Sequence, residues 1–525
     1  MNPPTVVLGA DHGGFAMKAH LAAYLKGKGY RVRDAGAATG EASDYPIFGL
    51  RVAEAVGRGE AEFGVLLCRS GNGMAMAANK VPGVRAAIAG DVELAELARR
   101  HNDANVLVLG ADYMKEDAVA VLEAFLSARP EDGRHARRVN IMKQFDQTLA
   151  SGLTTHQMAA HGQSPWLDDI SDELIASGRL GRMIEEEGLR GLTSNPSIFE
   201  KAINSGKGRY PADLARLKAQ GADAQTAYER LTMEDIAAAA DALLPVYDRT
   251  GGDDGFVSLE VLPSLAYEEE KSVAEATRLF AELGRPNVMI KVPGTDEGIR
   301  AFKRLTAAGV NINVTLIFSR VFYGRIARAY VAGLRERIAA GEDATGVRSV
   351  ASVFVSRIDT LIDKRLEEMR AAEKDPARRE KIDSILHRVA IANTKLIYQD
   401  FKSIFMGEEF ADLAEAGAAV QRPLWGSTSA KNPDLPDTLY AEELIGAHTV
   451  NTLPAATLEA MIDRGRVRGA TIEEDVAGAR ATMKTLAELG IDIEEACMKL
   501  QKDGVKSFAD AFDKLFAAIQ KALGK

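Results

Sequence analysis

Lys291 lies inside the apolar run VMIKVPG, where a charged side chain has no obvious structural use. Burial disfavours the ammonium form of a lysine, so a buried lysine offers a free amine that can attack a carbonyl carbon. The alternative is a lysine at a strand end whose ammonium group reaches water while its stem stays buried. The run alone supports the two interpretations about equally. A nucleophilic Lys291 would allow Schiff-base chemistry on a ketone or an aldehyde.

Other apolar runs in the same part of the chain end in polar residues that could assist such a lysine. Carboxylates can transfer protons, and amides and hydroxyls can hold a polar substrate. These residues are Asp168, Asp169, Thr193, Asn195, Glu260, Asn313, Thr315, Ser352, Ser427 and Asn451. The pattern therefore sets one lysine among carboxylates, amides and hydroxyls.

Eight apolar runs alternate with helical patterns in this region, which predicts a (β/α)₈ (TIM) barrel with insertions. The longest insertion, residues 210–248, has a helical pattern and falls between the second and third strands. Chemistry in such barrels is concentrated where the strands end, so we expect the polar residues above to meet at one face. The predicted strands are 165–170, 191–195, 256–261, 288–292, 311–318, 350–355, 423–428 and 447–454.

Six motifs in this region closely resemble the transaldolase family, in the family's order and spacing: SPWLDDIS, GLTSNPSIFEKAI, FVSLEV, MIKVPGT, NINVTLIFS and SVFVSRID. The resemblance covers roughly residues 164–525. It implies that Lys291 attacks a ketose carbonyl and forms an imine, while Glu260 and Thr315 position the water that is lost and regained. It also implies that Asp168 is the general acid/base. Asp169 is the alternative, because alternation along a strand points the two side chains to opposite faces.

The same resemblance implies how the sugar phosphate is held. Asn195 and Asn313 would hold a dihydroxyacetone unit, and Ser352 and Arg357 would contact hydroxyls and the phosphate. Many transaldolases have a second arginine after the seventh strand. Here that segment is PLWGSTSAKNPDLP, so Lys431 with Ser427 or Ser429 would replace it. Structural alternatives remain, since Asn195 could start a turn, Glu260 could form a rim salt bridge and Ser352 could fill the barrel.

Fructose 6-phosphate aldolases are the close competitor within this resemblance. These relatives tend to carry Gln at the position of Glu260 and Tyr at the position of Phe354. Glu260 and Phe354 therefore favour transfer between sugar phosphates over simple aldol cleavage. Thr193 completes the expected substrate-binding residues of the barrel.

The first part of the sequence contains a second set of residues that could do chemistry. Cys68 ends an apolar run and precedes the Gly-rich turn RSGNG, whose backbone N–H groups could stabilise an oxyanion or bind phosphate. A thiol at such a place could act as a base, although a lone cysteine in an apolar strand is more often part of the core. The motifs GADHGG, SDYP, RHNDANV and GRHARR add Asp11, His12, Tyr45, His101, Asn102, Arg134 and Arg138.

Five apolar runs position these motifs: residues 5–11, 30–36, 63–68, 84–90 and 105–110. They alternate with amphipathic helical stretches, so we expect a doubly wound parallel sheet of five strands with ligands at the carboxyl ends. Residues 1–147 would form this domain, residues 148–163 a linker, and residues 164–525 the barrel. The overall fold class is α/β.

The N-terminal motifs resemble type B ribose 5-phosphate isomerases over roughly residues 3–146. The resemblance implies that Cys68 moves a proton between the two carbons of an enediolate. Ser70 and the turn of residues 69–73, which includes Gly71, would stabilise the oxyanion. His101 would assist ring opening, Asp11 would bind hydroxyls, and His12, Arg134 and Arg138 would hold the phosphate. Tyr45 and Asn102 complete the expected binding residues.

Three positions depart from that family. Arg69 stands where relatives usually have Gly, and Asp112 where many have Arg. Met74 replaces a Glu that some relatives use, so Cys68 must be the base if the domain is active. His101 and Asn102 could instead cap a helix, and the basic tail could simply be solvated. Type B isomerases build their site across a dimer, often with His12 and the arginines from the neighbouring subunit. We therefore expect at least a homodimer.

Composition limits the other partners. The net charge of −10 disfavours nucleic acid, and no apolar stretch is long enough for a membrane span. Two cysteines, Cys68 and Cys497, favour a reducing compartment, and no signal peptide is visible, so we expect a cytoplasmic protein. No metal-ligand spacing is evident, and neither chemistry needs a cofactor.

The expected function is thus a bifunctional enzyme of the non-oxidative pentose phosphate pathway, with sugar phosphates as substrates. Two alternatives remain for the N-terminal domain. It could be a non-catalytic sugar-phosphate-binding or dimerisation module, or an isomerase of another aldose phosphate such as allose 6-phosphate.

Overall fold

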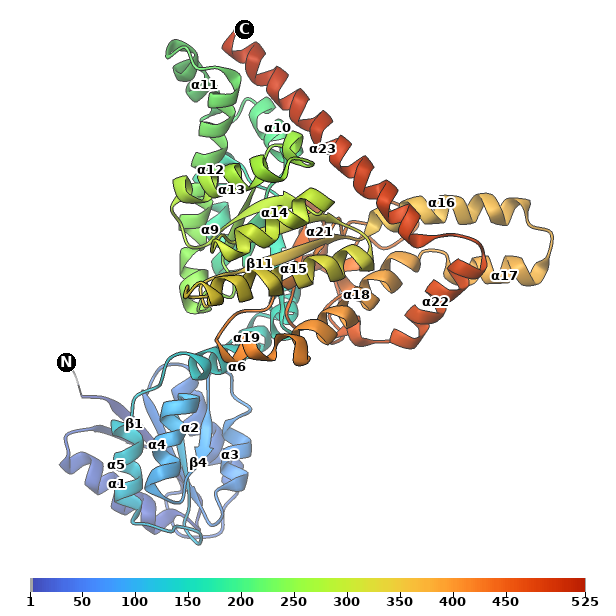
Figure 1. The fold of residues 1–525 in the computed structure, drawn as a ribbon. Helices are drawn as coiled ribbons and strands as arrows, with labels where there is room; N and C mark the ends of the chain where they lie inside the picture. Colours follow the sequence, from blue (N-terminus) through green and yellow to red (C-terminus); the bar gives the residue numbers. More distant parts are fainter. Residues whose placement is uncertain (1–2, 525) are drawn as a thin grey trace. The chain divides into compact units, whose positions relative to one another are not determined.

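The computed structural model describes residues 3–524, apart from the side chains of Gln144 and residues 147–151. The chain folds into two compact units, Met1–Gly152 and Leu153–Lys525 (Figure 1). Residues 148–163, expected as a linker, contain the end of helix α6 (Arg134–Ser151), residues 152–153, helix α7 (Thr154–Ala160) and the first residue of strand β6. None of the described helices is long and apolar enough to cross a membrane.

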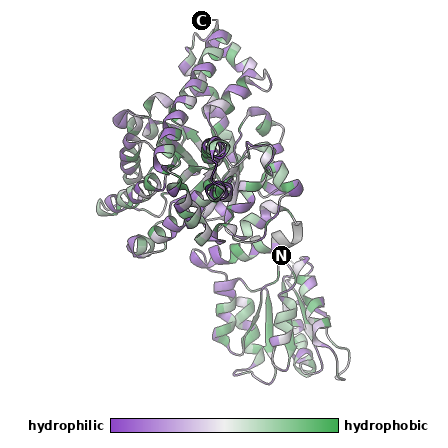
Figure 2. Cartoon of the chain, turned by 90° about the vertical axis from the view of Figure 1, so that its right-hand side faces the viewer, coloured by the Kyte–Doolittle hydropathy of each residue, from purple (hydrophilic) through white to green (hydrophobic). Residues whose placement is uncertain are grey.

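The N-terminal unit contains the predicted sheet of five parallel strands, in the order β2-β1-β3-β5-β4. Successive residues of a strand face opposite sides, so Val6 and Leu8 pack into one core and Val7 into another. Helices α1, α4 and α5 cover the first side, and α2 and α3 cover the second. Figure 2 shows the strands of this unit as its most hydrophobic part.

The strands are β1 (Thr5–Ala10), β2 (Arg31–Asp34), β3 (Phe63–Cys68), β4 (Ala86–Ile88) and β5 (Val106–Gly110). The helices before α6 are α1 (Phe15–Gly27), α2 (Tyr45–Gly57), α3 (Asn72–Ala78), α4 (Val92–Asn102) and α5 (Ala118–Ser127).

The C-terminal unit is a closed barrel of eight parallel strands, as the sequence predicted. Parallel register sets Glu260 of β8 beside Lys291 of β9, and Lys291 beside Asn313 of β10. Because laterally paired residues share a face, these three side chains point the same way. The strands are β6 (Gln163–Leu167), β7 (Gly191–Thr193), β8 (Phe256–Glu260), β9 (Val288–Pro293), β10 (Ile312–Ile317), β11 (Ser349–Phe354), β12 (Arg422–Gly426) and β13 (Thr449–Leu453).

Helices surround the barrel, and the predicted helical insertion lies between β7 and β8 as α11 and α12, after the short helix α10. The helices are α8 (Asp172–Ala176), α9 (Arg179–Glu185), α10 (Pro196–Asn204), α11 (Tyr210–Ala219), α12 (Ala224–Arg249), α13 (Glu269–Leu283), α14 (Asp296–Ala307), α15 (Arg320–Ala339), α16 (Ser356–Ala372), α17 (Pro376–Ile385), α18 (Val389–Phe405), α19 (Ala411–Glu415), α20 (Leu439–Glu443), α21 (Ala455–Arg464), α22 (Val476–Glu488) and α23 (Ile493–Leu523). Short 3₁₀ turns lie at η1 (Pro263–Leu265), η2 (Glu408–Phe410) and η3 (Thr471–Glu473).

The last helix, α23, is the longest and is drawn in red in Figure 1. It packs against α10, α11, α12, α16, η1 and strand β10. Its buried residues include Gly504, Phe508, Ala511, Leu515 and Ile519. They recur every three or four residues, as expected when one face of a helix packs on the rest of the domain.

Candidate active sites

Lys291 lies within the barrel, and only 4% of its surface is exposed. Its Nζ donates a hydrogen bond to the carbonyl oxygen of Ser194 (3.1 Å) and lies 3.9 Å from Oε2 of Glu260. The centre of the Phe508 ring is 5.8 Å from the same nitrogen. This burial excludes the alternative of a strand-end lysine whose ammonium reaches water. The amine is therefore placed where a carbonyl substrate would be shielded from solvent.

Glu260 is the acidic neighbour of Lys291 and is almost as deeply buried. Burial raises the pKa of Glu260 to about 7, an effect that the Lys291 charge opposes and the Asp168 charge reinforces. A carboxyl with a pKa near neutrality can both give and accept a proton at physiological pH. Its pKa thus suits proton transfer better than that of a solvent-exposed glutamate.

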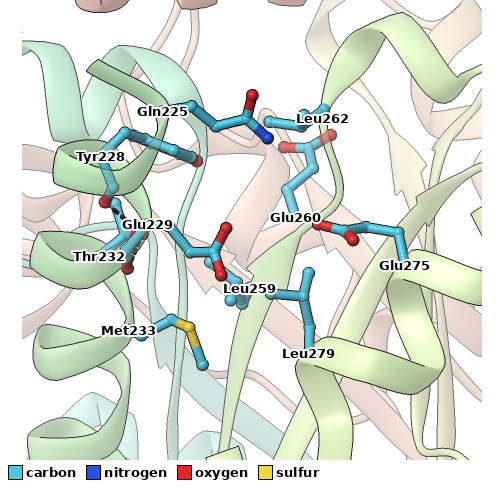
Figure 3. Close-up of a pocket in the computed structure, with 10 residues that line it drawn as sticks. All are labelled: Gln225, Tyr228, Glu229, Thr232, Met233, Leu259, Glu260, Leu262, Glu275 and Leu279. Atoms are coloured by element: carbon cyan, nitrogen blue, oxygen red, sulfur yellow. Dashed lines mark hydrogen bonds between the residues drawn. The ribbon is translucent and has the colours of Figure 1, made fainter. Parts of the chain in front are cut away.

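A small cavity of about 20 Å³ adjoins Glu260 between α12 and α13 (Figure 3). Tyr228 and Thr232 of α12 and Glu275 of α13 line it, and the amide of Gln225 points toward the Glu260 carboxyl. A space of this size holds about one water molecule. Glu260 therefore borders Lys291 on one side and a water-sized space on the other.

Two polar atoms near the lysine have no hydrogen-bond partner among the described residues. They are Oε2 of Glu260 and Oγ1 of Thr315, and both are buried. Thr315 precedes Leu316, which has a positive φ of 61° at a register shift in β10. Such bulges re-aim side chains beside active sites. Buried polar atoms without partners mark a place for water or substrate.

The two adjacent aspartates have different surroundings. Asp168 accepts a hydrogen bond from Oγ1 of Thr193 (2.7 Å), a residue that pairs in register with Ser258. The charge of Asp168 also raises the pKa of Glu260, so Asp168 lies close to the same carboxyl that the Lys291 charge acts on. Burial raises the pKa of Asp169, and the charge of Lys201 opposes this shift. The geometry therefore groups Asp168, and not Asp169, with Lys291.

The polar residues expected to hold substrate are partly engaged within the protein. Asn313 donates to Oγ of Ser258 (3.0 Å) and accepts from Oγ of Ser352 (2.6 Å). Asn195 caps α10, because its Oδ1 accepts from the backbone N–H of Ile198 (3.2 Å). The expected turn role of Asn195 is thus present. These bonds fix both side chains in place: Asn313 lies on the strand next to Lys291, and Asn195 follows Ser194, whose carbonyl accepts from the Lys291 amine.

Two cations lie close together near the ends of β11 and β12. The guanidinium of Arg357 lies 4.9 Å from the centre of the Phe354 ring, and burial lowers its pKa. Burial and the nearby charge of Arg357 also lower the pKa of Lys431. Lys431 donates to Oγ of Ser429 (2.7 Å), and Ser427 contacts Oγ of Ser356 at 3.1 Å.

Neither cation has an ion-pair partner in the part of the chain that the structure describes. The charge of Asp168 acts on Arg357 in the stabilising direction, but the two close positive charges still repel one another, and an anion between them would relieve that repulsion. A dianionic phosphate matches both the planar fork of an arginine and the point charge of a lysine.

The N-terminal unit gathers its first group of expected residues at the carboxyl ends of β1 and β3. Sγ of Cys68 accepts from the backbone N–H of Gly71 (3.1 Å), and Gly71 has a positive φ of 80° that glycine tolerates. Oδ1 of Asp11 accepts from the backbone of Gly13 (2.9 Å). Tyr45 packs against Gly73 in the turn that follows Cys68 and Ser70. His12 lies in the same group, because its Nδ1 accepts from the backbone of Ser43 (3.3 Å).

Two of the three departures from the isomerase pattern, Arg69 and Asp112, face one another. Nε of Arg69 lies 3.7 Å from Oδ2 of Asp112, and both side chains are more than half exposed. The backbone N–H of Asp112 also donates to the carbonyl of Arg69 (3.0 Å). Asp112 is thus held against Arg69, in the turn that follows Cys68. An exposed pair of this kind contributes little to stability, at most about 1 kcal/mol.

The remaining expected residues form a second group. The rings of His101 and His135 stack with their centres 4.0 Å apart, and Nε of Arg134 donates to Nε2 of His135 (3.1 Å). Glu131 pairs with Arg100 and lies 3.6 Å from Nε2 of His101. Burial lowers the pKa of His135. Glu131 and His135 are not among the residues expected from the sequence, although His135 lies within the GRHARR motif.

This second group also includes Asn102 and Arg138, both exposed on α4 and α6. The ligand atoms of His101, Glu131 and His135 lie within 4.8 Å of one another, close enough for a metal ion. However, Arg100 already pairs with Glu131, and Arg134 donates a hydrogen bond to His135. The two arginines leave the group with a net positive charge. Its chemistry therefore suits an anion better than a cation.

The two groups lie at opposite ends of the strands of the sheet. Residues 103–105, which follow His101 and Asn102, contact Arg85 just before β4 starts. The residue after β5, Ala111, instead donates to the carbonyl of Cys68 (2.8 Å) at the other end. A five-residue strand separates these ends by roughly 15 Å. One sugar phosphate therefore cannot contact Cys68 and the His101 group of the same chain.

Comparison with known proteins agrees with this division. Residues 165–519 match the family model "Transaldolase/Fructose-6-phosphate aldolase", and residues 6–142 match "Ribose/Galactose Isomerase". Transaldolase 1 of Streptomyces coelicolor is 44% identical over 377 residues, which cover 72% of this chain and 97% of that protein. The transaldolase of Thiobacillus denitrificans is 44% identical over 365 residues, covering 70% of this chain and 99% of its own.

The N-terminal unit has its own relatives among solved structures. Ribose-5-phosphate isomerase B of Clostridium thermocellum is 42% identical, with 28% of this chain and 99% of that chain covered and a TM-score of 0.27. The type B ribose 5-phosphate isomerase of Trypanosoma cruzi is 40% identical, with 27% of this chain and 99% of that chain covered and a TM-score of 0.27. The chain therefore belongs to the transaldolase/fructose-6-phosphate aldolase family and carries an N-terminal domain of the ribose/galactose isomerase family.

Proposed function

We propose that the barrel transfers a dihydroxyacetone unit from sedoheptulose 7-phosphate to glyceraldehyde 3-phosphate through a Schiff base on Lys291. The products are erythrose 4-phosphate and fructose 6-phosphate. The observation that carries this proposal is the buried Lys291 amine beside Glu260, whose pKa is about 7. Relatives at 44% identity that are named transaldolases support the reaction class.

In this reaction the Lys291 amine adds to the ketose carbonyl, and the carbinolamine loses water to form a protonated imine. Glu260 and Thr315 hold that water, which the unpaired atoms Oε2 and Oγ1 support. Asp168 takes the proton of the hydroxyl whose carbon–carbon bond breaks, with Thr193 orienting the carboxylate. The electrons of the broken bond move into the imine and give an enamine. The nucleophilic carbon of this enamine then attacks the acceptor aldehyde.

The far end of the sugar phosphate binds between Arg357 and Lys431. The lowered pKa of both groups and their mutual proximity support this assignment. Asn195 and Asn313 hold the dihydroxyacetone unit on the lysine. Ser352, with Arg357, contacts hydroxyls and the phosphate, and Ser427 or Ser429 assists Lys431 at the phosphate. Phe354 packs beneath the arginine.

The N-terminal domain interconverts ribose 5-phosphate and ribulose 5-phosphate through an enediolate. Cys68 moves the proton, and the N–H groups of the turn around Ser70 and Gly71 stabilise the oxyanion. His101 assists ring opening, while Asp11, Tyr45 and Asn102 bind the sugar. Phosphate contacts come from His12, Arg134 and Arg138. Since the two groups lie at opposite ends of the strands of one sheet, each site combines residues of two chains in at least a homodimer.

Paired assays on the full chain test both assignments. We expect Lys291→Ala to abolish dihydroxyacetone transfer and to leave ribose 5-phosphate isomerisation within about twofold of wild type. Cys68→Ala should have the opposite effect. A wild-type chain that transfers but does not isomerise would leave the N-terminal domain a binding or dimerisation module. Faster isomerisation of a six-carbon aldose phosphate would identify a different substrate.

A further inference from the structure

Helix α23 contacts three parts of the barrel site at once. Nε2 of Gln501 donates to the carbonyl oxygens of Gly294 (2.8 Å) and Leu316 (3.3 Å), which follow Lys291 and Thr315 along their strands. Gly504 lies so close to Leu316 that a Cβ at this position would approach its Cδ2 to 2.9 Å. The same Cβ would lie 3.8 Å from a guanidinium nitrogen of Arg357. The helix therefore passes directly over the site.

Phe508 is the residue of α23 that reaches the lysine. One turn beyond Gly504, its ring centre lies 5.8 Å from Nζ of Lys291, and 8% of its surface is exposed. Phe512, one further turn along, packs instead on Tyr228 with ring centres 5.1 Å apart. The aromatic surface over Lys291 thus comes from Phe508.

We propose that Phe508 determines whether the dihydroxyacetone imine on Lys291 is transferred to an aldehyde or lost to water. This inference rests on the proposed transaldolase function and adds a specificity-determining residue to it. The ring covers the imine with an apolar surface that excludes water. Its π-face also stabilises the positive charge of the protonated imine, an effect of about 0.5–2 kcal/mol.

The competing reaction is hydrolysis of the imine. Water adds to the iminium carbon, a proton shifts to nitrogen, and the C–N bond then breaks, giving free dihydroxyacetone and the Lys291 ammonium. This side reaction needs no acceptor sugar, so water admitted beside Lys291 in addition to the molecule that Glu260 and Thr315 hold raises its rate. Removing the ring should therefore change the ratio of hydrolysis to transfer more than it changes transfer itself.

The test measures free dihydroxyacetone released from fructose 6-phosphate, and transfer to erythrose 4-phosphate, on the full chain. We expect Phe508→Ala to raise the ratio of release to transfer about tenfold. Phe508→Leu, which keeps an apolar cover, should restore the ratio to within about threefold of wild type. If Phe508→Ala does not fold, Phe508→Val removes less volume and should raise the ratio in the same direction.

Phe516→Ala is the matched control, because Phe516 lies on the same helix and stacks on Phe512. A ratio in Phe508→Ala within twofold of wild type, or an equal rise in Phe516→Ala, would overturn the proposed role. Wild-type transfer and imine trapping on Lys291 test the transaldolase proposal separately. The two proposals can therefore fail independently.

Discussion

At the scale of single residues, the central feature is a lysine and a glutamate that do not form a closed ion pair. Nζ of Lys291 and Oε2 of Glu260 are 3.9 Å apart, and both side chains are buried. Separated charges inside a protein are costly, so burial holds the glutamate partly protonated near pH 7. The pair is thereby ready to exchange a proton with a water molecule.

Replacing Glu260 by Gln should lower kcat by roughly 10²-fold, the usual contribution of a proton-transfer group. In the wild-type enzyme we expect kcat/KM to rise with an apparent pKa of about 7 as the carboxylate forms. The variant should lose that dependence, which pH–rate profiles will show. A variant with the wild-type profile would remove Glu260 from the mechanism, and Glu229→Gln, in the same cavity wall, is the control.

Stability should depend on pH through the same group. The folded pKa of about 7 lies above the ordinary value of 4.5, so the folded chain binds an extra proton between these values. The stability linked to Glu260 is therefore present below pH 4.5 and lost as the pH rises through 7. Glu260→Gln stays neutral, so its Tm should exceed that of wild type increasingly from pH 6 to pH 8. Equal Tm curves would contradict the buried position of the carboxyl.

The pair of cations makes a second prediction at this scale. Lys431→Met should raise KM for fructose 6-phosphate roughly 10- to 100-fold, because a hydrogen bond to a charged group contributes about 1.5–3 kcal/mol. The effect should vanish with unphosphorylated fructose, which steady-state kinetics can compare. Equal effects on both substrates would place Lys431 away from the phosphate. Lys499→Met, on an exposed part of α23, is the matched control.

At the scale of elements, the bulge in β10 and helix α23 position the site together. Leu316 adopts a positive φ directly after Thr315, a conformation that costs about 1–3 kcal/mol and persists only when its surroundings hold it. Gln501 holds it by donating to its carbonyl oxygen. The last helix of the chain thus supports the orientation of a side chain on the fifth strand of the barrel.

Gln501→Leu should therefore act on catalysis as well as on stability. It leaves two carbonyl oxygens without their donor, a loss of about 1–3 kcal/mol, and it frees the bulge. We expect kcat to fall about tenfold with KM nearly unchanged, since the phosphate contacts lie elsewhere. A lowered Tm with wild-type kcat would show that α23 stabilises the barrel without orienting Thr315.

Strand and helix patterns predicted the elements better than the contacts between them. All eight barrel strands and all five N-terminal strands lie where the apolar runs indicated, because buried parallel strands are hydrophobic on both faces. The bulge at Leu316 leaves no such pattern. The sequence pattern did not mark Phe508 as a site residue either, because a phenylalanine on an amphipathic helix usually packs in the hydrophobic core. Glu131 and His135 were missed because only folding brings them beside His101.

At the scale of the whole molecule, the proposed isomerase site combines residues of more than one chain. The Cys68 group and the His101 group lie at opposite ends of the strands of one sheet. In the proposed dimer, a second copy brings its own His101 group to the Cys68 end, and the reciprocal contact builds a second, identical site, as twofold symmetry requires. The barrel site, in contrast, is built from one chain.

Mixing two inactive variants should therefore restore isomerase activity. Cys68→Ala and Arg138→Ala each disable one half of the site, and a mixed dimer contains one intact pair of halves. After unfolding and refolding an equal mixture, we expect about a quarter of wild-type activity, because half of the dimers are mixed and each has one working site. Activity no higher than that of the separate variants would show that the site lies within one chain. Transferase activity should be unaffected throughout.

The most direct test of the central claim is chemical trapping of the imine. Borohydride reduction of the full chain in the presence of fructose 6-phosphate should fix a three-carbon adduct, which peptide mass spectrometry should locate on Lys291. Lys291→Ala should give no adduct and no transfer. An adduct on another lysine, or trapping that persists in Lys291→Ala, would contradict the assignment of Lys291 as the Schiff-base nucleophile.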